Sequence, residues 1–299
     1  MRITHCAYYL GCALFLSSAA TFADSHKMEA KIEAIKVSDN IHMLTGKGGN
    51  IGVLTGADGT FMIDDQFSPL TPKILAKIKE IGGEHPKFLI NTHFHGDHTG
   101  GNENLGKAGT LIVSHNNVRE RMASGSYIQA FKMKSLPASA DALPVITFSD
   151  DISFHINGGQ VHAIHTPHAH TDGDSFIHFK EQNVIHAGDL FFNGFYPFID
   201  INHGGSVKGM ISAVDKILAI ADDKTKIIPG HGPLATKSDL QAYRDMLQTA
   251  YNKLRLMKIS GMSVTDAMAA KPLAELDQEW SDGLFSSSRW IEIVYPGIY

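Results

Sequence analysis

Cysteine is nearly absent from this chain. Of its 299 residues only Cys6 and Cys12 are cysteines, and both lie among the first 23 residues. A mature chain that begins after residue 23 would therefore hold neither a disulfide nor a thiolate metal ligand. Later in the chain there is also no apolar run of membrane-spanning length. A large excess of one charge is missing too, since 26 basic and 31 acidic residues give −5. This balance argues against nucleic acid or an anionic membrane as partner and favours a small-molecule substrate.

The first 23 residues have the pattern of a secretory signal peptide. Arg2 precedes the apolar stretch AYYLGCALFLSSAA, and the small-residue pattern TFA precedes Asp24. We therefore expect cleavage after Ala23 and a periplasmic or secreted protein with no membrane attachment. A membrane anchor and a lipoprotein site at Cys12 are the alternatives. The apolar run is short for a membrane span, however, and most of it follows Cys12.

Short β-rich runs alternate with helical patterns along most of the chain, which indicates a layered α/β fold. No linker rich in Pro or Ser divides the chain, so we expect one domain over residues 24–299 with a mostly helical C-terminal part. The expected strands are 41–45, 51–55, 60–63, 88–91, 111–114, 152–156, 160–165, 175–179, 184–187 and 226–229. The expected helices are 72–81, one near residue 103, 207–221, 237–258 and 265–270, followed by an irregular tail.

Residues 116–142 form a long polar segment that contains Met and Ser. Two interpretations remain open, a helical insertion that covers a site and plain surface. The lid-like insertion is slightly favoured, although no residue type in the segment requires it.

Ligand-type side chains gather in the stretch NTHFHGDHTGGN, which begins at Asn91 after an apolar run. Side chains alternate in an extended segment, so His93, His95 and Asp97 are expected to point the same way. A turn that begins at His98 would direct that side chain toward a different ion. Imidazole and carboxylate groups are ligands that Zn²⁺ accepts. Chance clustering is the alternative, because the chain has 17 histidines, but four ligand-type residues within six positions favour a metal site. Three more candidates lie near predicted strand ends: His170, Asp189 and His231.

The HxHxDH pattern at 93–98, followed in order by His170, Asp189 and His231, resembles the metallo-β-lactamase superfamily over residues 41–232. The resemblance implies a four-layer αβ/βα sandwich with a dinuclear metal site at one edge and a ligand set like that of glyoxalase II. It implies two Zn²⁺ per chain, with Fe or Mn as alternative metals. By the same resemblance the first ion is held by His93, His95 and His170, the second by Asp97, His98 and His231, and Asp189 bridges them.

The chemistry that follows is hydrolysis by a hydroxide held between the two metals, with Asp97 as the catalytic residue that orients it and helps to protonate the leaving group. The expected substrate is a small-molecule ester, lactone, thioester or amide. Hydrolysis of β-lactams is one alternative, but no lysine follows Asp189 in the segment LFFN. Iron-dependent redox chemistry of the persulfide dioxygenase type is a second. The diiron branch usually has His-x-Glu where this chain has His95. A binding protein with a degenerate site is a third alternative, although no ligand is missing.

Three residues near the motifs are weaker candidates for a role at the site. Asp64 ends a predicted strand and resembles the acidic residue of the superfamily that lies close to the site, so we expect it to orient a ligand. Asp65 is expected to face solvent. His186 lies within a strand pattern and is expected to be a hydrogen-bonded core histidine.

Two loops hold the remaining candidates. His165 and His168 precede His170 where many relatives have a shorter turn, and His170 is preferred as ligand because TDGD follows it. The loop after Asp189 offers three residues for the wall of a substrate cleft, with surface packing as the alternative: Asn193, Tyr196 and His203.

Overall fold

The structure is a computed structural model that describes residues 31–299. The predicted signal peptide, residues 1–23, lies outside the described residues. Within the described part, no helix is both long enough and apolar enough to span a bilayer.

The N-terminal sheet has seven strands. Its first four strands pair antiparallel, and the later pairs are parallel. In spatial order the strands are β1 (Glu33–Lys36), β2 (Ile41–Thr45), β3 (Ile51–Leu54), β4 (Thr60–Ile63), β5 (Pro86–Ile90), β6 (Leu111–His115) and β9 (Ile146–Phe148).

The C-terminal sheet has five strands, of which only the last two pair in parallel. In spatial order they are β10 (Asp151–Ile156), β11 (Gly159–His165), β12 (Ser175–Phe179), β13 (Val184–Phe192) and β14 (Lys226–His231).

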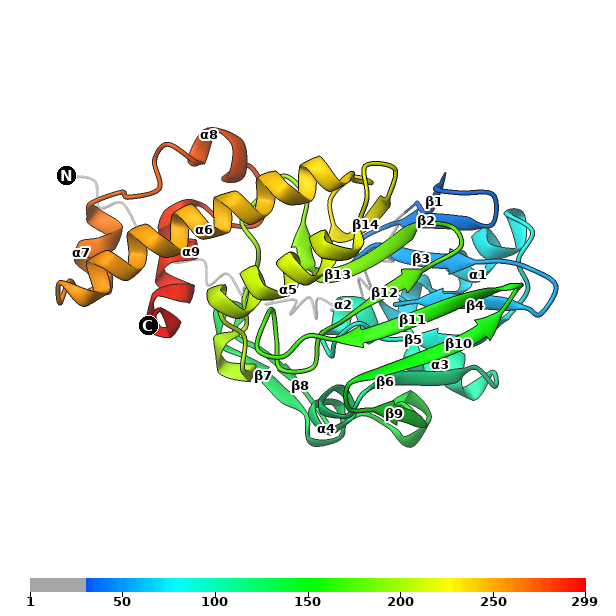
Figure 1. Cartoon of the computed structure of the whole chain (residues 1–299). Coiled ribbons are helices and arrows are strands. Elements are labelled where there is room, and N and C mark those ends of the chain that lie inside the picture. Colours follow the sequence, from blue (N-terminus) through cyan, green and yellow to red (C-terminus); the bar gives the residue numbers. More distant parts are fainter. Residues whose placement is uncertain (1–30) are drawn as a thin grey trace, which may run out of the picture.

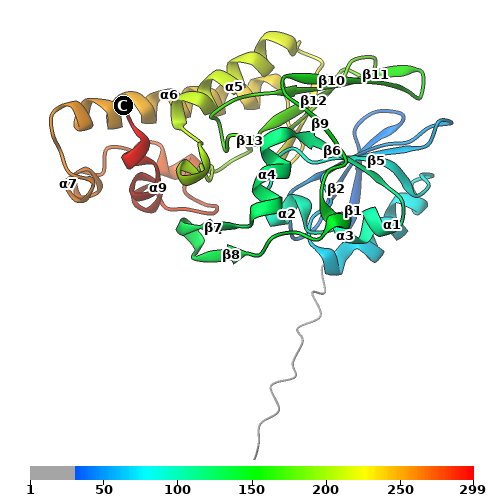
Figure 2. The same cartoon turned by 90° about the horizontal axis from the view of Figure 1, so that it is seen from below.

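Helices cover the outer faces of both sheets, which gives four layers (Figure 2). α5 and α6 lie across the C-terminal sheet (Figure 1), and α1 and α3 lie on the far side of the N-terminal sheet. This is the αβ/βα sandwich that the resemblance implies. The helices are α1 (Thr71–Glu80), α2 (Gly96–Thr99), α3 (Asn102–Lys107), α4 (Asn116–Ser124), α5 (Val207–Ile220), α6 (Lys237–Ile259), α7 (Val264–Ala269), α8 (Asp277–Trp280) and α9 (Ser287–Val294).

A hydrophobic core between the two sheets holds the sandwich together. Phe61 and Ile90 of the N-terminal sheet belong to the same buried cluster as Ile177 and Ile228 of the C-terminal sheet. Burial of such side chains contributes about 1.5–3 kcal/mol each. The two sheets are therefore fixed relative to each other, and so are the loops that leave their strand ends.

The C-terminal tail differs most from the prediction. An irregular tail was expected, but α8 and α9 are helices, and Trp290, Ile291 and Val294 form the buried face of α9. The short strands β1 and β9 were not predicted either. Strand β13 continues five residues beyond its predicted end, because it is buried along its whole length.

Residues 116–142 are only partly helical. α4 is followed by a two-stranded hairpin of β7 (Ser126–Ile128) and β8 (Met133–Ser135), which lies near α9 (Figure 2). Arg289 Nη2 of α9 donates to the backbone oxygen of Ala130 at 2.9 Å, and the ring of Phe131 stacks on that of Phe285 at 5.9 Å. The C-terminal segment therefore holds the tip of the hairpin.

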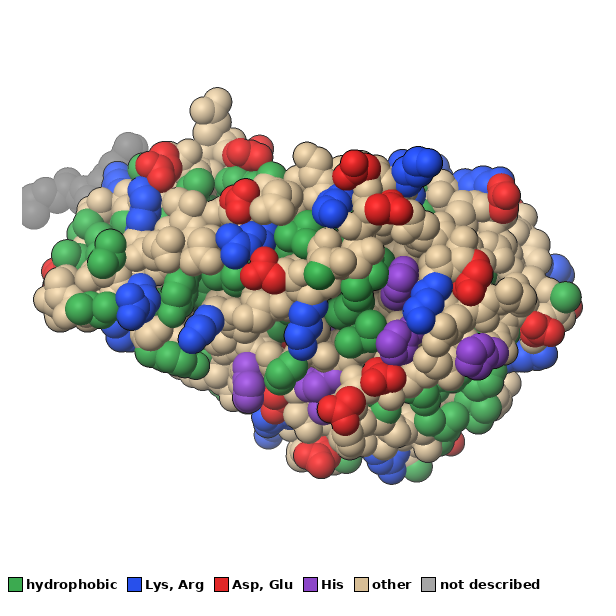
Figure 3. Space-filling model, viewed as in Figure 1, with side chains coloured by type: hydrophobic (Ala, Val, Ile, Leu, Met, Phe, Trp, Pro, Cys, Tyr) green, Lys and Arg blue, Asp and Glu red, His purple; other side chains and the backbone are tan. Residues whose placement is uncertain are grey.

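The molecular face in Figure 3 carries acidic and basic side chains that alternate over its surface. Neither sign gathers into a large patch on this face. Such a surface offers no extended track for a polyanion.

Candidate metal centre

The predicted ligands lie where strands of both sheets end. β5 leads directly into the HxHxDH segment, and the parallel strands β13 and β14 carry Asp189 and His231. The segment after β5 is fixed by a reciprocal pair of side-chain amide hydrogen bonds, since Asn91 donates to Asn102 at 3.0 Å and Asn102 donates back at 2.9 Å. A buried pair of this kind holds the loop in one conformation.

Two groups of ligand-type atoms face each other at this edge, and within each group these atoms lie within 4.8 Å of one another. Their division is the one that the resemblance implies, with Asp189 placed in the first group. The first group is His93, His95, His170 and Asp189, and the second is Asp97, His98 and His231.

The expectation from strand alternation is wrong for Asp97. The chain is no longer extended at this point, because helix α2 begins at Gly96. Asp97 and His98 therefore turn together toward the second group, whereas His93 and His95 remain in the first.

Asp189 lies between the two groups and directs one carboxylate oxygen to each. Its Oδ2 is 3.7 Å from Nε2 of His93 and 3.5 Å from Nε2 of His170. Its Oδ1 is 3.0 Å from Nε2 of His98 and 3.5 Å from Nε2 of His231. This is the geometry of a carboxylate shared by two sites.

Three of the histidine rings donate hydrogen bonds outward to groups that can only accept. His95 Nε2 donates to Asp200 Oδ2 at 3.0 Å, and His98 Nδ1 donates to Asp64 Oδ2 at 2.7 Å. His170 Nδ1 donates to the backbone oxygen of Phe198 at 2.7 Å. Whenever one of these rings is neutral, its inward nitrogen therefore carries a lone pair.

In the first group, neutral rings with these outward bonds bring their inward nitrogen atoms together with no hydrogen between them. Nδ1 of His95 is 2.8 Å from Nε2 of His170, and Nε2 of the buried His93 has no hydrogen-bond partner. Asp189 Oδ1 also accepts no hydrogen bond. Converging lone pairs repel unless a cation lies among them, so the first group fits a divalent metal. The second group offers imidazole and carboxylate donors, a set that a divalent metal also accepts.

Burial and charge set the protonation of the two groups differently. Burial lowers the pKa of His93 well below its usual value and that of His170 to about 4, so both rings are neutral near pH 7. For His231, burial opposes protonation, but the carboxylates of Asp189 and Asp97 outweigh it and raise the pKa to about 9. Burial raises the pKa of Asp97, but His98 and His231 prevail and lower it to about 2.

Asp64 has the orienting role that the sequence predicts. Besides the bond from His98, it accepts hydrogen bonds from the backbone nitrogen and the hydroxyl of Thr92, both at 2.8 Å. Asp64 adopts a left-handed φ of 58°, and such backbone strain is concentrated at functional sites. The prediction for Asp65 is wrong, because this carboxylate is buried and accepts a bond from the backbone nitrogen of Gly101 at 2.9 Å.

Sequence reasoning missed Asp200, which no motif or spacing marks. Its buried carboxylate accepts from His95 and, at 2.6 Å, from Nδ1 of His203. His203 is therefore engaged behind the metal centre and does not form the wall of a cleft. Tyr196 is fully buried against Trp290 with ring centroids 5.3 Å apart, and Asn193 donates to the backbone oxygen of Pro233.

The three other histidines considered in the sequence analysis lie outside the two ligand groups. His186 is a buried core residue whose Nε2 donates to the backbone oxygen of Asn50 at 3.0 Å, as predicted. The His165 ring stacks on that of His115 at 3.7 Å, and His168 is exposed. Neither His165 nor His168 belongs to the two ligand groups.

A cavity of about 490 Å³ opens over the second group. Asp97, Asp189 and His231 lie at its polar end, and aromatic residues of the loop after β13 form much of its wall. The hairpin contributes Ile128 and Phe131 to the wall.

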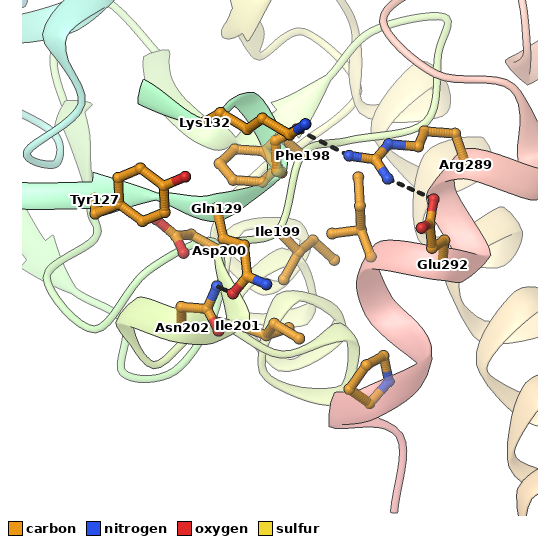
Figure 4. Close-up of a pocket in the computed structure, with 13 residues that line it drawn as sticks. Tyr127, Gln129, Lys132, Phe198, Ile199, Asp200, Ile201, Asn202, Arg289 and Glu292 are labelled. Carbon is orange, nitrogen blue, oxygen red and sulfur yellow. Dashed lines mark hydrogen bonds and ion pairs between the residues drawn. The ribbon is translucent and has the colours of Figure 1, made fainter. Parts of the chain in front are cut away.

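A second cavity of about 630 Å³ is lined by Tyr127, Lys132 and Asp200 among others (Figure 4). None of the seven predicted ligands lines this second cavity. The smaller cavity is therefore the one that opens onto the candidate metal ligands. Phe198 lines both cavities.

Comparison with known proteins agrees with this geometry. A protein of Pelagibacter ubique named hydroxyacylglutathione hydrolase is 27% identical over 55% of this chain, and the match spans 59% of that protein. A probable hydroxyacylglutathione hydrolase, glo2, of Schizosaccharomyces pombe is 28% identical over 64% of this chain and 67% of its own length. The solved sec-alkylsulfatase Pisa1 from Pseudomonas sp. superimposes with a TM-score of 0.66 at 18% identity, over 90% of this chain and 51% of that one. The sequence profile of the metallo-beta-lactamase superfamily matches residues 44–231, and the chain belongs to this superfamily.

Proposed function

We propose that the protein is a hydrolase that uses two divalent metal ions, Zn²⁺ first among them, to cleave an ester, thioester, lactone or amide of a small molecule. The observation that carries the proposal is the position of Asp189, whose two oxygens face different ligand groups. A carboxylate shared in this way suits two ions a short distance apart.

The chemistry divides between the ions and the side chains of the chain. Two divalent cations, when bound, lower the pKa of a water molecule and polarise the oxygen of the bond to be cleaved. Asp97 is placed to handle the proton, because its side chain is 30% exposed, lines the cavity and lies with Oδ2 3.3 Å from Nε2 of His231. From this position Asp97 can accept a hydrogen bond from the attacking water and later return a proton to the leaving group.

The outer hydrogen bonds supply the required rigidity. Asp64 fixes the ring of His98, and Asp200 fixes the ring of His95, so neither histidine has to reorient during turnover. The names of the two relatives support a hydrolase of acyl compounds.

The test combines metal content with activity. We expect native mass spectrometry of the zinc-loaded protein to show two ions, and His93→Ala and His231→Ala each to lose one. Asp189→Ala should lose both ions or nearly all turnover of a model ester, whereas the surface variant Asp215→Ala should keep both. Stoichiometric iron together with oxygen consumption, or full metal content and turnover in Asp189→Ala, would overturn the proposal.

We also propose that the mature protein begins at Asp24 after export and acts on small molecules rather than on nucleic acid or a membrane. The pattern of the first 23 residues supports export. The mixed charges on the face in Figure 3 support a small-molecule substrate. N-terminal sequencing of the natural product tests the cleavage, and a product that begins at Met1 would contradict it.

A further inference from the structure

We infer that this site takes substrates in which the cleavable bond is attached to an extended apolar group, an alkyl or aryl acyl chain. The inference rests on the proposed hydrolase function and adds the substrate class to it. It derives from the cavity over the second ligand group.

Apolar surface begins directly beside the reacting groups. The ring of Phe192 stacks on that of His231, with centroids 5.1 Å apart and an interplanar angle of 19°. Phe192 and Phe198 are almost completely buried, so this part of the wall is rigid. If the cleavable bond of a substrate lies at Asp97, the substrate atoms next to that bond therefore contact aromatic side chains.

The apolar wall continues to the mouth of the cavity. Phe131 packs against Phe198 with centroids 4.9 Å apart and is 37% exposed, while Met133 and Leu284 at the same cavity are 56% and 48% exposed. Large apolar side chains grouped around an opening mark a surface that a ligand covers. An acyl chain that leaves the metal centre has a continuous apolar path to solvent.

The charges at this cavity favour the same substrate class. Among the described residues that line it, Lys47 is the only Lys or Arg. A polyanionic substrate would find one cation against a wall of phenylalanines. Binding of an apolar chain instead buries the apolar surface of both the chain and the cavity wall, which is favourable.

The first experiment measures binding without turnover. Acetate, butyrate, hexanoate and octanoate are titrated into the zinc-loaded protein by isothermal titration calorimetry. We expect the affinity to rise about threefold to fourfold per methylene until the cavity is filled, since burial of one methylene contributes about 0.8 kcal/mol. Equal affinity along the series would overturn the inference.

The second experiment assigns the effect to the wall. Phe131→Ser and Leu284→Ser alter exposed positions at the mouth, and Leu256→Ser, 67% exposed on α6, is the matched control. We expect the first two to flatten the chain-length dependence and the control to keep it. If both wall variants keep the wild-type dependence, the inference is wrong.

A third measurement separates this inference from the proposed function. The 4-nitrophenyl esters of the same acids are offered to the zinc-loaded protein, and kcat/KM is expected to rise with chain length. Hydrolysis with no chain-length dependence would refute the substrate class and leave the hydrolase proposal intact. Chain-dependent binding of the acids without hydrolysis of any of these esters, or of the matching thioesters, lactones and amides, would support the apolar site and refute the hydrolase.

Discussion

Asp200 Oδ2 lies 3.0 Å from Nε2 of His95, on the side of the ring that faces away from the ligand group. The two residues are 105 positions apart in the sequence, and the fold brings them together. Because the carboxylate only accepts, it keeps the hydrogen on Nε2 and leaves the lone pair of Nδ1 directed at the first group.

Asp200→Ala should weaken metal binding at the first group about 10-fold to 100-fold, because the ring of His95 loses the partner that fixes its orientation. Competition with a chromogenic chelator measures this affinity. Asp200→Asn, whose amide oxygen still accepts, should lose less. The surface variant Asp215→Ala is the control, and equal affinity in Asp200→Ala and this control would show that Asp200 has no positioning role.

Trp290 of α9 should matter for the metal centre as well as for stability. Its Nε1 donates to the backbone oxygen of Pro197 at 2.8 Å, one residue before Phe198, whose backbone oxygen accepts from His170. Trp290→Phe leaves that buried carbonyl oxygen without a partner, so we expect unfolding by urea to show a loss of about 1–3 kcal/mol. We also expect weaker metal binding.

The control for this variant is Trp280→Phe, which changes a buried indole but keeps the backbone hydrogen bond of 2.9 Å from the nitrogen of Tyr196 to the oxygen of Trp280. It should lower stability through packing and leave metal affinity unchanged. Equal metal affinity in both variants would refute the connection between Trp290 and the centre.

Acid should destabilise the protein through His165. Burial, together with the charge of the stacked His115, lowers its pKa to about 4. The unfolded residue has a pKa of about 6.5, so between these values the unfolded state binds a proton that the folded state does not. The contribution of His165 to the free energy of unfolding is therefore fully present above about pH 6.5 and is lost as the pH falls toward 4.

His165→Gln removes this contribution. Its loss of unfolding free energy between about pH 7 and pH 5 should be smaller than that of the wild type by about 1 kcal/mol, a value reduced for the partial exposure of the ring. Urea titrations at both pH values measure it, with the exposed His155→Gln as control. A pH dependence equal to that of the wild type would contradict the prediction.

Activity toward β-lactams should be weak compared with that toward esters or lactones. Leu190, Phe191 and Phe192 follow Asp189 along β13 and are all buried apolar residues. They leave no cation there for the drug carboxylate, and a missing charge-assisted hydrogen bond costs about 1.5–3 kcal/mol. The comparison is kcat/KM for a penicillin, a cephalosporin and a carbapenem beside acyl esters. A value of about 10⁵ M⁻¹s⁻¹ or more for the β-lactams would disprove the ranking.

The sequence predicted a layered α/β fold, and its resemblance to the superfamily implied the sandwich. All seven residues of the two groups were named from the sequence, because the dense HxHxDH spacing is a local signal and the other three lie near predicted strand ends. It also predicted the role of Asp64, which lies at a strand end. The same local reasoning was wrong for Asp65, because its burial depends on the backbone of Gly101, 36 residues later.

Features that depend on tertiary packing could not be predicted from the sequence. Asp200 has no neighbouring motif, and only the folded loop brings it to His95. Helix α9 is eight residues long with little intrinsic preference, and packing of Trp290 in the core stabilises it. The hairpin that forms one wall of the cavity is similarly held by contacts with the C-terminal segment.

The candidate ligands lie in one part of the chain. The residue that holds the loop behind them lies in another. All seven candidates fall within 44–231, whereas Trp290 lies far beyond it and anchors the turn that leads to Phe198 and Asp200. A chimaera that transplants only residues 44–231 into another scaffold would carry every candidate ligand but not the tryptophan. Grafting of this centre therefore requires α9, or an indole donor rebuilt at the same carbonyl.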